Sequence, residues 1–556
     1  MISDIIQAQQ VVLLFKQRAV QHIVISPGSR NAPLTLSFSE DPFFTCYSIV
    51  DERCAAHFAL GIAQQLKEPV AVVCTSGSAL LNYYPAVTEA YYSEIPLIVL
   101  SADRPPHKID IGDGQTIKQQ HVYANHIIYD TQLEMIEKLD DLEAITTNER
   151  LIHKAITASV SQNGPVHINV PFEEPLYNII EKAIIQPSQT SIKENEVASI
   201  PQKFQEQWGK AGRKLIILST LNPNVLSKED LDLLTADPAV LIMSEVSCNI
   251  NHDNVIWGID TLIAPIEKDP ETIAYLQPDM VITIGGMIVS KKIKQFLRKF
   301  EPQHHYHIGH RRAYDTFFKL SGHIKMNPST WVAQLEPSTG NSDYGAYWLA
   351  FFKTYVEKRV SYLHNMPWSD FKAFKLLFEQ LPNDIVLQLG NSSTIRYAQL
   401  FPMNATHAIF SNRGTSGIDG CTSTAIGAAV AGSKPTVFIT GDLSFFYDSN
   451  ALWNNYIPSS FKIIVINNSG GGIFRILPGD KENHNFQTYF ETTHQLDASH
   501  LCAMHGVDYH RVDEEHAFAK AYKTFIEDNS KPQLLEVFTP RLENDTVLLD
   551  YFKFLK

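Results

Sequence analysis

Two stretches in the last third of the chain decide the fold: TVFITGD at residues 436–442 and KIIVINNSGG at residues 462–471. Each begins with a continuous apolar run and ends in polar or glycine residues, and a segment of helix length separates them. Buried parallel strands have this character, because helices cover both faces of their sheet. The pair therefore predicts a strand–helix–strand unit with Asp442 and Asn468 at the carboxyl ends of neighbouring strands.

Apolar runs of the same kind recur along the chain, with helix-like segments between them. They occupy residues 21–29, 69–78, 95–103, 165–171, 214–219, 239–246, 280–286, 304–310, 384–392 and 533–540. This alternation predicts the α/β class. Two polar stretches, residues 186–202 and 336–344, divide the chain. We therefore expect three doubly wound parallel-sheet domains, at residues 1–185, 186–345 and 346–556.

A weak internal repeat links the first and last of these blocks. ALGIAQQLKEPVAVVCTSGS starts at Ala59, and AIGAAVAGSKPTVFITGDLS starts at Ala425. In each copy a further helical segment leads into another apolar strand. One interpretation is that any two doubly wound domains share such a pattern. The other is a pair of similar domains that together enclose one ligand.

The composition is that of a folded globular protein. Of the 556 residues, 44% are hydrophobic and 19% are charged, and the formal net charge is -14 without a polybasic tract. This argues against a nucleic-acid surface or a membrane-binding patch. The first residues favour an amphipathic helix over a signal peptide, and no apolar run approaches the roughly 20 residues of a membrane span. The six scattered cysteines have no CxxC pair, so we expect no zinc site or disulfide framework and a cytoplasmic location.

The two strand ends carry hard oxygen ligands. The Asp442 carboxylate, the Asn468 amide oxygen and the Gly470 carbonyl suit Mg²⁺, which prefers oxygen ligands and commonly bridges to phosphate. Gly470 to Gly472 allow a diphosphate to approach the backbone closely. Either dipeptide alone, GD or NN, is more often an ordinary turn, but their placement at two strand ends points to a ligand site.

GD followed by NN across one such unit resembles the signature of the thiamine-diphosphate enzyme superfamily. The resemblance implies that Asp442, Asn468 and Gly470 hold Mg²⁺ (or Mn²⁺) on thiamine diphosphate. It also implies further contacts to the cofactor from Ile418, Leu443, Ser444, Gly471 and Ile473. Superfamily members usually have glycine after the aspartate, whereas this chain has Leu443.

The superfamily also requires a carboxylate on the pyrimidine ring of the cofactor. SIVDERCAAHFALG, residues 48–61, places Glu52 after a strand and at the start of a helix. By resemblance Glu52 is the catalytic residue, which exchanges a proton with the ring nitrogen N1′. The ordinary alternative is a solvated glutamate in the first turn of a helix, favoured there by the helix dipole.

Four further motifs indicate one branch of the superfamily. They are SPGSRNAP at residues 26–33, SADRPP at 101–106, GNSSTIR at 390–396 and NRGTSGIDG at 412–420. With GDLS in place of GDG, the whole chain resembles the 2-succinyl-5-enolpyruvyl-6-hydroxy-3-cyclohexene-1-carboxylate synthases of the menaquinone pathway. That resemblance implies the loss of CO₂ from 2-oxoglutarate and addition of the remaining succinyl unit to isochorismate.

Both of these substrates are dicarboxylates, so the site needs fixed cations, and arginine binds carboxylates with two parallel hydrogen bonds. The resemblance implies substrate contacts from Ser29, Arg30, Arg104, Gln115, Lys291, Lys292, Ser392, Arg396, Arg413, Phe474 and Leu477. For each arginine the alternative is a surface ion pair, and for the two lysines it is a solvated helix start. Gly114 stands where relatives often have asparagine, which puts the hydrogen bonds of that loop in question.

The resemblance also implies a homodimer or homotetramer with active sites at the subunit interface. Three other functions stay open at this point. Another thiamine-diphosphate 2-oxo acid decarboxylase or an acetolactate-type synthase would need fewer arginines. A non-catalytic protein on the same fold would not need Glu52, Asp442 and Asn468 together. A dinucleotide-dependent dehydrogenase would have GxGxxG after a strand, which NRGTSGIDG does not match.

Overall fold

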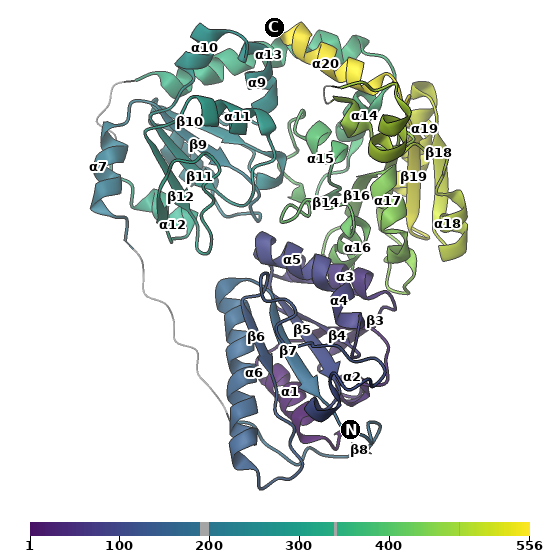
Figure 1. The fold of residues 1–556 in the computed structure, drawn as a ribbon. Coiled ribbons are helices and arrows are strands. Elements are labelled where there is room, and N and C mark those ends of the chain that lie inside the picture. Colours follow the sequence, from purple (N-terminus) through teal and green to yellow (C-terminus); the bar gives the residue numbers. More distant parts are fainter. Residues whose placement is uncertain (189–198, 338–341, 477–478) are drawn as a thin grey trace. The chain divides into compact units, whose positions relative to one another are not determined.

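The computed structural model describes residues 1–188, 199–337, 342–476 and 479–556. Within these residues, all strands except two belong to three parallel sheets, and helices flank each sheet (Figure 1). The remaining strands, β1 (Ile2–Ser3) and β8 (Ile179–Ile180), form a small antiparallel pair. The predicted α/β class with three parallel sheets is therefore confirmed. No helix among the described residues is long and apolar enough to cross a membrane.

The first sheet has the strand order β3-β2-β4-β5-β7-β6. Its strands are β2 (His22–Ile25), β3 (Thr45–Ser48), β4 (Val70–Cys74), β5 (Leu97–Asp103), β6 (Tyr129–Gln132) and β7 (Val166–Pro171). Its helices are α1 (Ile6–Gln17), α2 (Ala32–Ser39), α3 (Glu52–Leu66), α4 (Ala79–Asn82), α5 (Tyr84–Ser93), η1 (Pro106–Lys108) and α6 (Leu142–Gln162). Helices α1, α2 and α6 share one apolar cluster with alternate residues of the central strands, as a doubly wound sheet requires.

The central sheet has the order β10-β9-β11-β12-β13. Its strands are β9 (Lys214–Leu218), β10 (Val240–Ser244), β11 (Met280–Ile284), β12 (His304–Ile308) and β13 (Leu320–Ile324). Its helices are α7 (Gln202–Lys210), α8 (Lys228–Thr235), η2 (Val246–Cys248), α9 (Ile259–Ile266), α10 (Pro270–Tyr275), α11 (Lys291–Lys299), α12 (Pro328–Ala333) and α13 (Tyr344–Asn365). Two separate apolar clusters cover its two faces.

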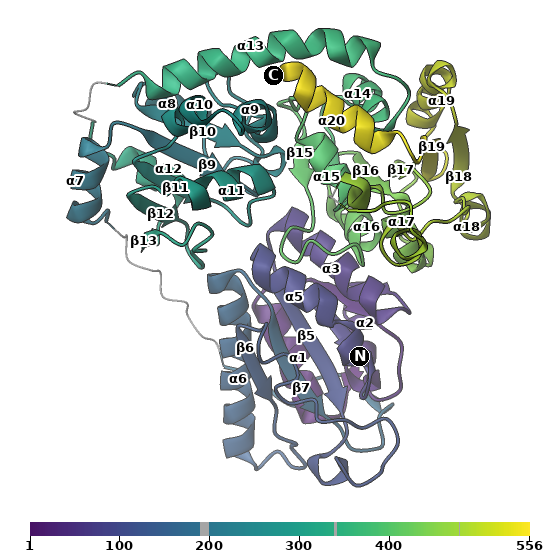
Figure 2. The same cartoon turned by 45° about the horizontal axis from the view of Figure 1, so that its top comes forward.

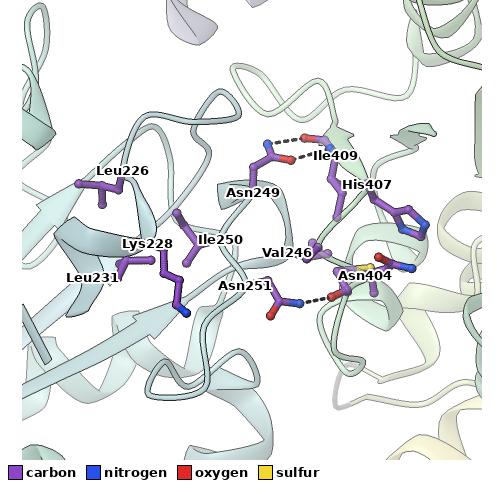
Figure 3. A pocket seen from close by; sticks show the side chains of 12 residues that line it. Leu226, Lys228, Leu231, Val246, Asn249, Ile250, Asn251, Asn404, His407 and Ile409 are labelled. Carbon is purple, nitrogen blue, oxygen red and sulfur yellow. Dashed lines mark hydrogen bonds between the residues drawn. The ribbon is translucent and has the colours of Figure 1, made fainter. Parts of the chain in front are cut away.

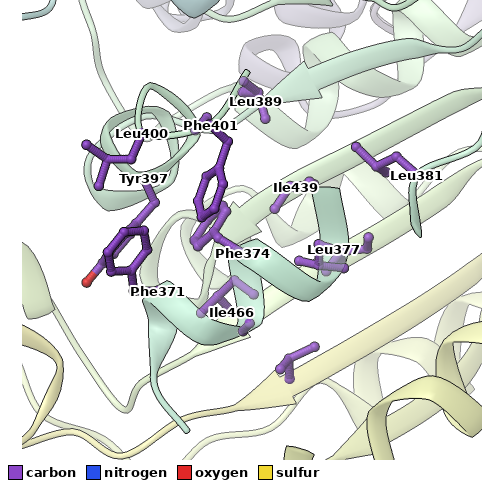
Figure 4. Packing of buried hydrophobic residues seen from close by; sticks show 14 of the residues in the cluster. Phe371, Phe374, Leu377, Leu381, Leu389, Tyr397, Leu400, Phe401, Ile439 and Ile466 are labelled. Atoms are coloured by element: carbon purple, nitrogen blue, oxygen red, sulfur yellow. The ribbon is translucent and has the colours of Figure 1, made fainter. Parts of the chain in front are cut away.

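The third sheet has the order β15-β14-β16-β17-β19-β18. Its strands are β14 (Val386–Leu389), β15 (Ala408–Phe410), β16 (Thr436–Gly441), β17 (Lys462–Asn467), β18 (Asp508–Val512) and β19 (Gln533–Phe538). Its helices are α14 (Asp370–Gln380), α15 (Ser393–Ala398), α16 (Cys421–Ala431), α17 (Asp442–Tyr447), η3 (Ser449–Leu452), η4 (Gly472–Ile476), η5 (Phe486–Glu491), α18 (Ser499–His505), α19 (Glu515–Glu527) and α20 (Asn544–Leu555). Phe371, Phe374 and Leu377 of α14 pack against Ile439 and Ile466 of the central strands (Figure 4).

The first and third sheets have the same topology. When their strands are numbered in chain order within each sheet, both read 2-1-3-4-6-5, whereas the central sheet reads 2-1-3-4-5. The internal repeat lies on corresponding elements, because its two copies run through α3 to β4 and through α16 to β16. The repeat therefore reflects two domains of one fold.

By their internal contacts the residues form two compact units. The first comprises residues 1–195, 412–436 and 444–461, and the second comprises residues 196–411, 437–443 and 462–556, apart from the undescribed stretches. In the first unit α3 packs tightly on α16 through glycines. A Cβ at Gly61 would lie 2.1 Å from the Thr424 carbonyl oxygen, and one at Gly427 would lie 2.0 Å from the Phe58 carbonyl oxygen. Only glycine permits this approach of the two helices.

In the second unit the central and third sheets are joined by polar contacts. The Asn249 side chain donates to the Ile409 carbonyl at 2.9 Å and accepts from the Ile409 N–H at 2.6 Å, and Asn251 donates to the Met403 carbonyl at 2.7 Å (Figure 3). These residues line a pocket of about 150 Å³. Helix α13 also runs beside α20 (Figure 2). The predicted boundary after residue 345 falls at the start of this helix, and the polar stretch around residue 190 lies partly outside the described residues.

Candidate active site

The ends of β16 and β17 bring the predicted cation ligands together. Because the two strands pair in parallel with Gly441 opposite Ile466, Asp442 and Asn468 follow at the same edge of the sheet. Asp442 is buried, and its Oδ2 accepts the Gly470 N–H at 2.9 Å. Its Oδ1 accepts the Leu443 N–H at 2.7 Å, and His494 Nε2 lies 3.2 Å from Oδ2. A carboxylate has about four acceptor positions, so these contacts leave room for a cation.

Asn468 presents one end of its amide to a carboxylate. Its Nδ2 donates to Asp370 Oδ2 at 2.8 Å. Its Oδ1 is buried and accepts no hydrogen bond from the described residues. An unsatisfied buried oxygen costs free energy, which a bound cation would remove. The pKa of the Asp370 carboxyl is raised to about 6. Burial is the largest cause, and the nearby negative charge of Asp442 acts in the same direction.

The glycine loop after β17 is hydrogen-bonded to the end of η5. Gly470 has a φ of 147°, and a Cβ there would lie 2.6 Å from the Glu491 carbonyl oxygen, which accepts the Gly471 N–H at 2.6 Å. The buried Glu491 carboxylate in turn binds Arg475 at 2.5 Å and Arg541 at 2.6 Å. The Gly470 carbonyl accepts the Gly472 N–H at 3.0 Å, and the second lone pair of a carbonyl oxygen fits a cation.

Of the predicted apolar wall, Ile473 and Phe474 lie in η4 and are half-buried, and the rings of Phe474 and Phe490 meet edge to face with their centroids 6.2 Å apart. Leu477, also predicted there, lies outside the described residues. Asp442, Asn468 and Gly470 thus form an oxygen-rich site beside an apolar surface, and these ligand types fit Mg²⁺ on a diphosphate.

Glu52 lies in the other unit, as the first residue of α3. Asp51 caps this helix by accepting the Cys54 N–H at 3.2 Å. The Glu52 carboxylate accepts from Asn82 Nδ2 at 3.2 Å and is half-buried. Both the predicted position after a strand and the helix start are therefore present. The side chain reaches partly into solvent, where a ligand can meet it.

Loop 412–420, which carries Arg413 and Ile418, is bound to the first sheet's helices. Buried Glu89 of α5 accepts the Gly414 N–H at 2.7 Å, the Thr415 N–H at 2.6 Å and the Thr415 hydroxyl at 2.8 Å. Arg53, next to Glu52, donates to the Asp419 carbonyl at 2.9 Å. Ser444 Oγ donates to the Ile418 carbonyl at 3.1 Å. These contacts fix the loop on which Arg413 sits.

The remaining predicted residues of the first sheet follow β2 and β5. Ser29 is exposed, whereas Arg30 is buried and donates to the Phe172 carbonyl at 3.1 Å and to the Glu174 carboxylate at 3.0 Å. Arg104 donates through Nε to the Gly114 carbonyl at 2.9 Å, beside the exposed Gln115. With glycine at 114, the loop thus makes this hydrogen bond through its backbone.

In the second unit, Lys292 and Arg396 lie around one partly buried carboxylate, Asp260. Burial lowers the pKa of Arg396, while Asp260 and Glu245 act in the opposite direction. Lys292 also forms an ion pair with Glu267 at 2.7 Å, and Lys291 is exposed. Half-buried Ser392 precedes α15 with a φ of 64°. The structure therefore places Lys292 and Arg396 near the same carboxylate, and Lys292 forms an ion pair where the sequence alternative was a solvated helix start.

Sequence reasoning missed the carboxylates that hold these groups. Asp370, Glu89 and Glu245 bind, respectively, Asn468, loop 412–420 and the backbone N–H groups of Val289 and Ser290 ahead of α11. No local motif marks them, because each acts on a residue far away in the sequence. Buried acidic residues in an otherwise apolar helix or strand would have been the one available signal.

Comparisons with known proteins agree with this geometry. Residues 7–127 match the model for the thiamine pyrophosphate enzyme, N-terminal TPP binding domain, and residues 390–537 match the corresponding C-terminal TPP binding domain. Proteins named 2-succinyl-5-enolpyruvyl-6-hydroxy-3-cyclohexene-1-carboxylate synthase are similar over nearly the whole chain. That of Flavobacterium psychrophilum is 52% identical and covers 98% of both chains. Those of Christiangramia forsetii and Desulfotalea psychrophila are 50% and 36% identical, covering 100% and 95% of this chain and 99% and 97% of their own. The chain therefore belongs to the 2-succinyl-5-enolpyruvyl-6-hydroxy-3-cyclohexene-1-carboxylate synthase family of thiamine-diphosphate-dependent enzymes.

Proposed function

We propose that the chain joins 2-oxoglutarate to isochorismate with loss of CO₂, giving 2-succinyl-5-enolpyruvyl-6-hydroxy-3-cyclohexene-1-carboxylate in menaquinone biosynthesis. The observation that carries the proposal is the 52% identity over 98% of the chain to a synthase of that name. In the reaction the bond between C1 and C2 of 2-oxoglutarate breaks and CO₂ leaves. C2 then forms a bond to one carbon of the ring alkene of isochorismate, and the other alkene carbon takes up a proton.

Thiamine diphosphate supplies the electron sink for this chemistry when bound. Asp442, Asn468 Oδ1 and the Gly470 carbonyl would hold Mg²⁺ or Mn²⁺ on its diphosphate, as their oxygen chemistry and the unsatisfied Asn468 oxygen support. Further contacts to the cofactor would come from Leu443, Ser444, Gly471 and Ile473. Ile418 would add an apolar contact to it.

Glu52 has the one proton-transfer role in the proposal. Its carboxyl group would hold the proton that meets N1′ of the pyrimidine ring, where general acid–base catalysis contributes roughly 10²- to 10⁴-fold to the rate. Glu52→Gln keeps the size of the side chain but removes the exchangeable proton. We therefore expect it to abolish bond formation while the fold is kept.

The cations would bind the substrate carboxylates. Arg30, Arg104 and Arg413, with Ser29 and Gln115, supply this function from the first unit, and Arg396, Ser392, Lys291 and Lys292 supply it from the second. Arg30 is already fixed by Phe172 and Glu174, so it would bind a carboxylate with little loss of side-chain entropy. Phe474 and Leu477 would exclude water, which would otherwise divert the decarboxylated unit to an aldehyde.

The deciding experiment is a calorimetric titration with thiamine diphosphate and Mg²⁺, followed by turnover with 2-oxoglutarate plus isochorismate. We expect cofactor binding and the coupled product. Equal or faster turnover of pyruvate alone would instead support a decarboxylase or an acetolactate-type synthase. We also propose a cytoplasmic homodimer or homotetramer with active sites at the subunit interface, to be checked by sedimentation at several protein concentrations.

A further inference from the structure

The Asn468 side chain has a donor at one end of its amide and an acceptor at the other. Its Nδ2 donates to Asp370 Oδ2 at 2.8 Å, and its buried Oδ1 has no partner among the described residues. Rotation of the amide by half a turn would place its oxygen against a carboxylate oxygen, so that two acceptors would face each other. The Asp370 carboxylate therefore selects the orientation that leaves the amide oxygen available.

Asp370 is itself held firmly. Its Oδ1 accepts from the Thr539 hydroxyl at 2.5 Å, and its backbone N–H donates to Asn544 Oδ1 at 2.8 Å. It is the first residue of α14, and the next residue, Phe371, is fully buried in the apolar core of the third sheet (Figure 4). The carboxylate therefore cannot turn away from Asn468 without loss of packing or hydrogen bonds.

We propose that Asp370 is a positioning residue for the divalent cation, because it turns the side-chain oxygen of Asn468 toward the site formed with Asp442 and Gly470. The inference rests on the proposed function, which brings the cation and the diphosphate to this site. Partners that orient metal ligands typically change metal affinity about 10- to 100-fold when they are removed. Asp370 does not need to contact the cation for this effect.

The competing explanation is that Asp370 only stabilises the fold. Thr539→Val is the matched control, because it removes the other side-chain hydrogen bond of the same carboxylate and leaves the contact with Asn468. Mg²⁺ affinity is measured by calorimetry in the presence of excess thiamine diphosphate, and thermal unfolding is measured without either ligand. We expect Asp370→Ala to weaken Mg²⁺ binding about 10- to 100-fold. We expect Thr539→Val to lower the unfolding temperature while Mg²⁺ affinity stays close to that of the unchanged chain.

An exchange of the two side chains tests the orientation directly. Asn468→Asp alone sets two carboxylates against each other, so Mg²⁺ binding should weaken. Asp370→Asn together with Asn468→Asp swaps the amide and the carboxylate without changing the net charge. An amide at 370 can donate to a carboxylate at 468, which again leaves an oxygen toward the cation. The double variant should bind Mg²⁺ at least ten-fold more tightly than Asn468→Asp alone. A ten-fold change corresponds to about 1.4 kcal/mol.

The proposal is overturned if Asp370→Ala folds and binds Mg²⁺ as tightly as the unchanged chain. It is also overturned if the double variant binds no better than Asn468→Asp alone. If the unchanged chain binds no Mg²⁺ in the presence of thiamine diphosphate, the proposed function itself fails. That result appears before any variant is made, so the two failures are distinguishable.

Discussion

The first and third sheets share one scaffold but carry different chemistry at their strand ends. In both, a buried amide–carboxylate pair joins the fourth and sixth strands at the same register, since Ser101 pairs with Asn169 and Val465 pairs with Glu536. The acid lies on β5 in the first sheet, where Asn169 donates to Asp103 at 2.8 Å. It lies on β19 in the third, where Asn467 donates to Glu536 at 2.7 Å. Both sheets thus have the amide–carboxylate hydrogen bond at this place, but the strand that carries the amide in one sheet carries the carboxylate in the other.

The loops beyond this pair differ completely. Arg104 follows Asp103 in the first sheet, whereas Asn468 follows Asn467 in the third. In the two copies of the repeat Ser76 occupies the place of Asp442. In the proposed function, one sheet would therefore offer a cation for a substrate carboxylate, and the other would offer oxygens for a metal ion. Function here resides in a few residues after each strand and not in the topology.

The largest effect is expected where the comparison is sharpest, at Asp442 and Ser76. Asp442→Ala removes a proposed metal ligand, so Mg²⁺-dependent binding of thiamine diphosphate should weaken about 10²- to 10³-fold, which corresponds to about 3–4 kcal/mol. Ser76→Ala changes the corresponding position of the first sheet and should leave this affinity unchanged. Titration calorimetry of both variants checks the pair. Similar losses in the two would show that the strand ends are not specialised as proposed.

The helix contact common to both sheets gives the next largest effect. Gly61→Ala places a Cβ 2.1 Å from the Thr424 carbonyl, and such overpacking should lower the free energy of unfolding by about 1–3 kcal/mol. Gly209→Ala in α7, where a Cβ meets no atom within 4 Å, is the control and should stabilise by roughly 0.5–1 kcal/mol. Urea denaturation measures both. An unchanged midpoint for Gly61→Ala would contradict the close approach of α3 and α16.

Glu89 is the counterpart of Asp370 in the first unit, since each is a buried carboxylate that holds a segment with proposed site residues. Glu89→Gln keeps one acceptor oxygen but places an amide N–H₂ against the N–H of either Gly414 or Thr415, so the loop with Arg413 should shift. The loss of one charge-assisted hydrogen bond, about 1.5 kcal/mol, predicts a roughly ten-fold lower kcat/KM, mainly through KM. Ser93→Ala removes a different donor to the same carboxylate and is the control. Equal kinetics for all three proteins would exclude the role of Glu89.

The smallest effect is expected in the central sheet, where a substitution should change only the pH dependence of the free energy of unfolding. Burial lowers the pKa of His307 to about 3, whereas an unfolded histidine titrates near 6.5. Between these values the unfolded state binds the extra proton, so stability is lost as pH falls below about 6.5, at up to about 1.4 kcal/mol per pH unit. His307→Phe should reduce this slope while turnover at neutral pH is kept, and His305, whose pKa burial lowers to about 4, should keep part of it. Urea titrations from pH 5 to 7 check it, and an unaltered slope would assign the pH dependence elsewhere.

The sequence was sufficient for the strands in the middle of each sheet, because they are buried on both faces and apolar throughout. It did not reveal β6, β13, β15 and β18, all of which lie at sheet edges. An edge strand such as Asp508–Val512 contains three polar residues among five and is only partly buried, so it has no continuous apolar run. The cation ligands were predictable because they adjoin strand ends. Asp370 and Glu89 were not, since they bind residues 98 and 325 positions away.

The glycine contact between α3 and α16 also decides how the protein can be dissected. A fragment cut at residue 346 would carry α16 away from its partner helix. The backbone around Gly427, now covered by Phe58, would then face water, and no side chain there could shield it. Such a fragment should aggregate or unfold. A fragment that keeps residues 1–188 joined to α16 by a redesigned linker would retain the contact between α3 and α16. A split version of this enzyme should therefore not separate these two helices.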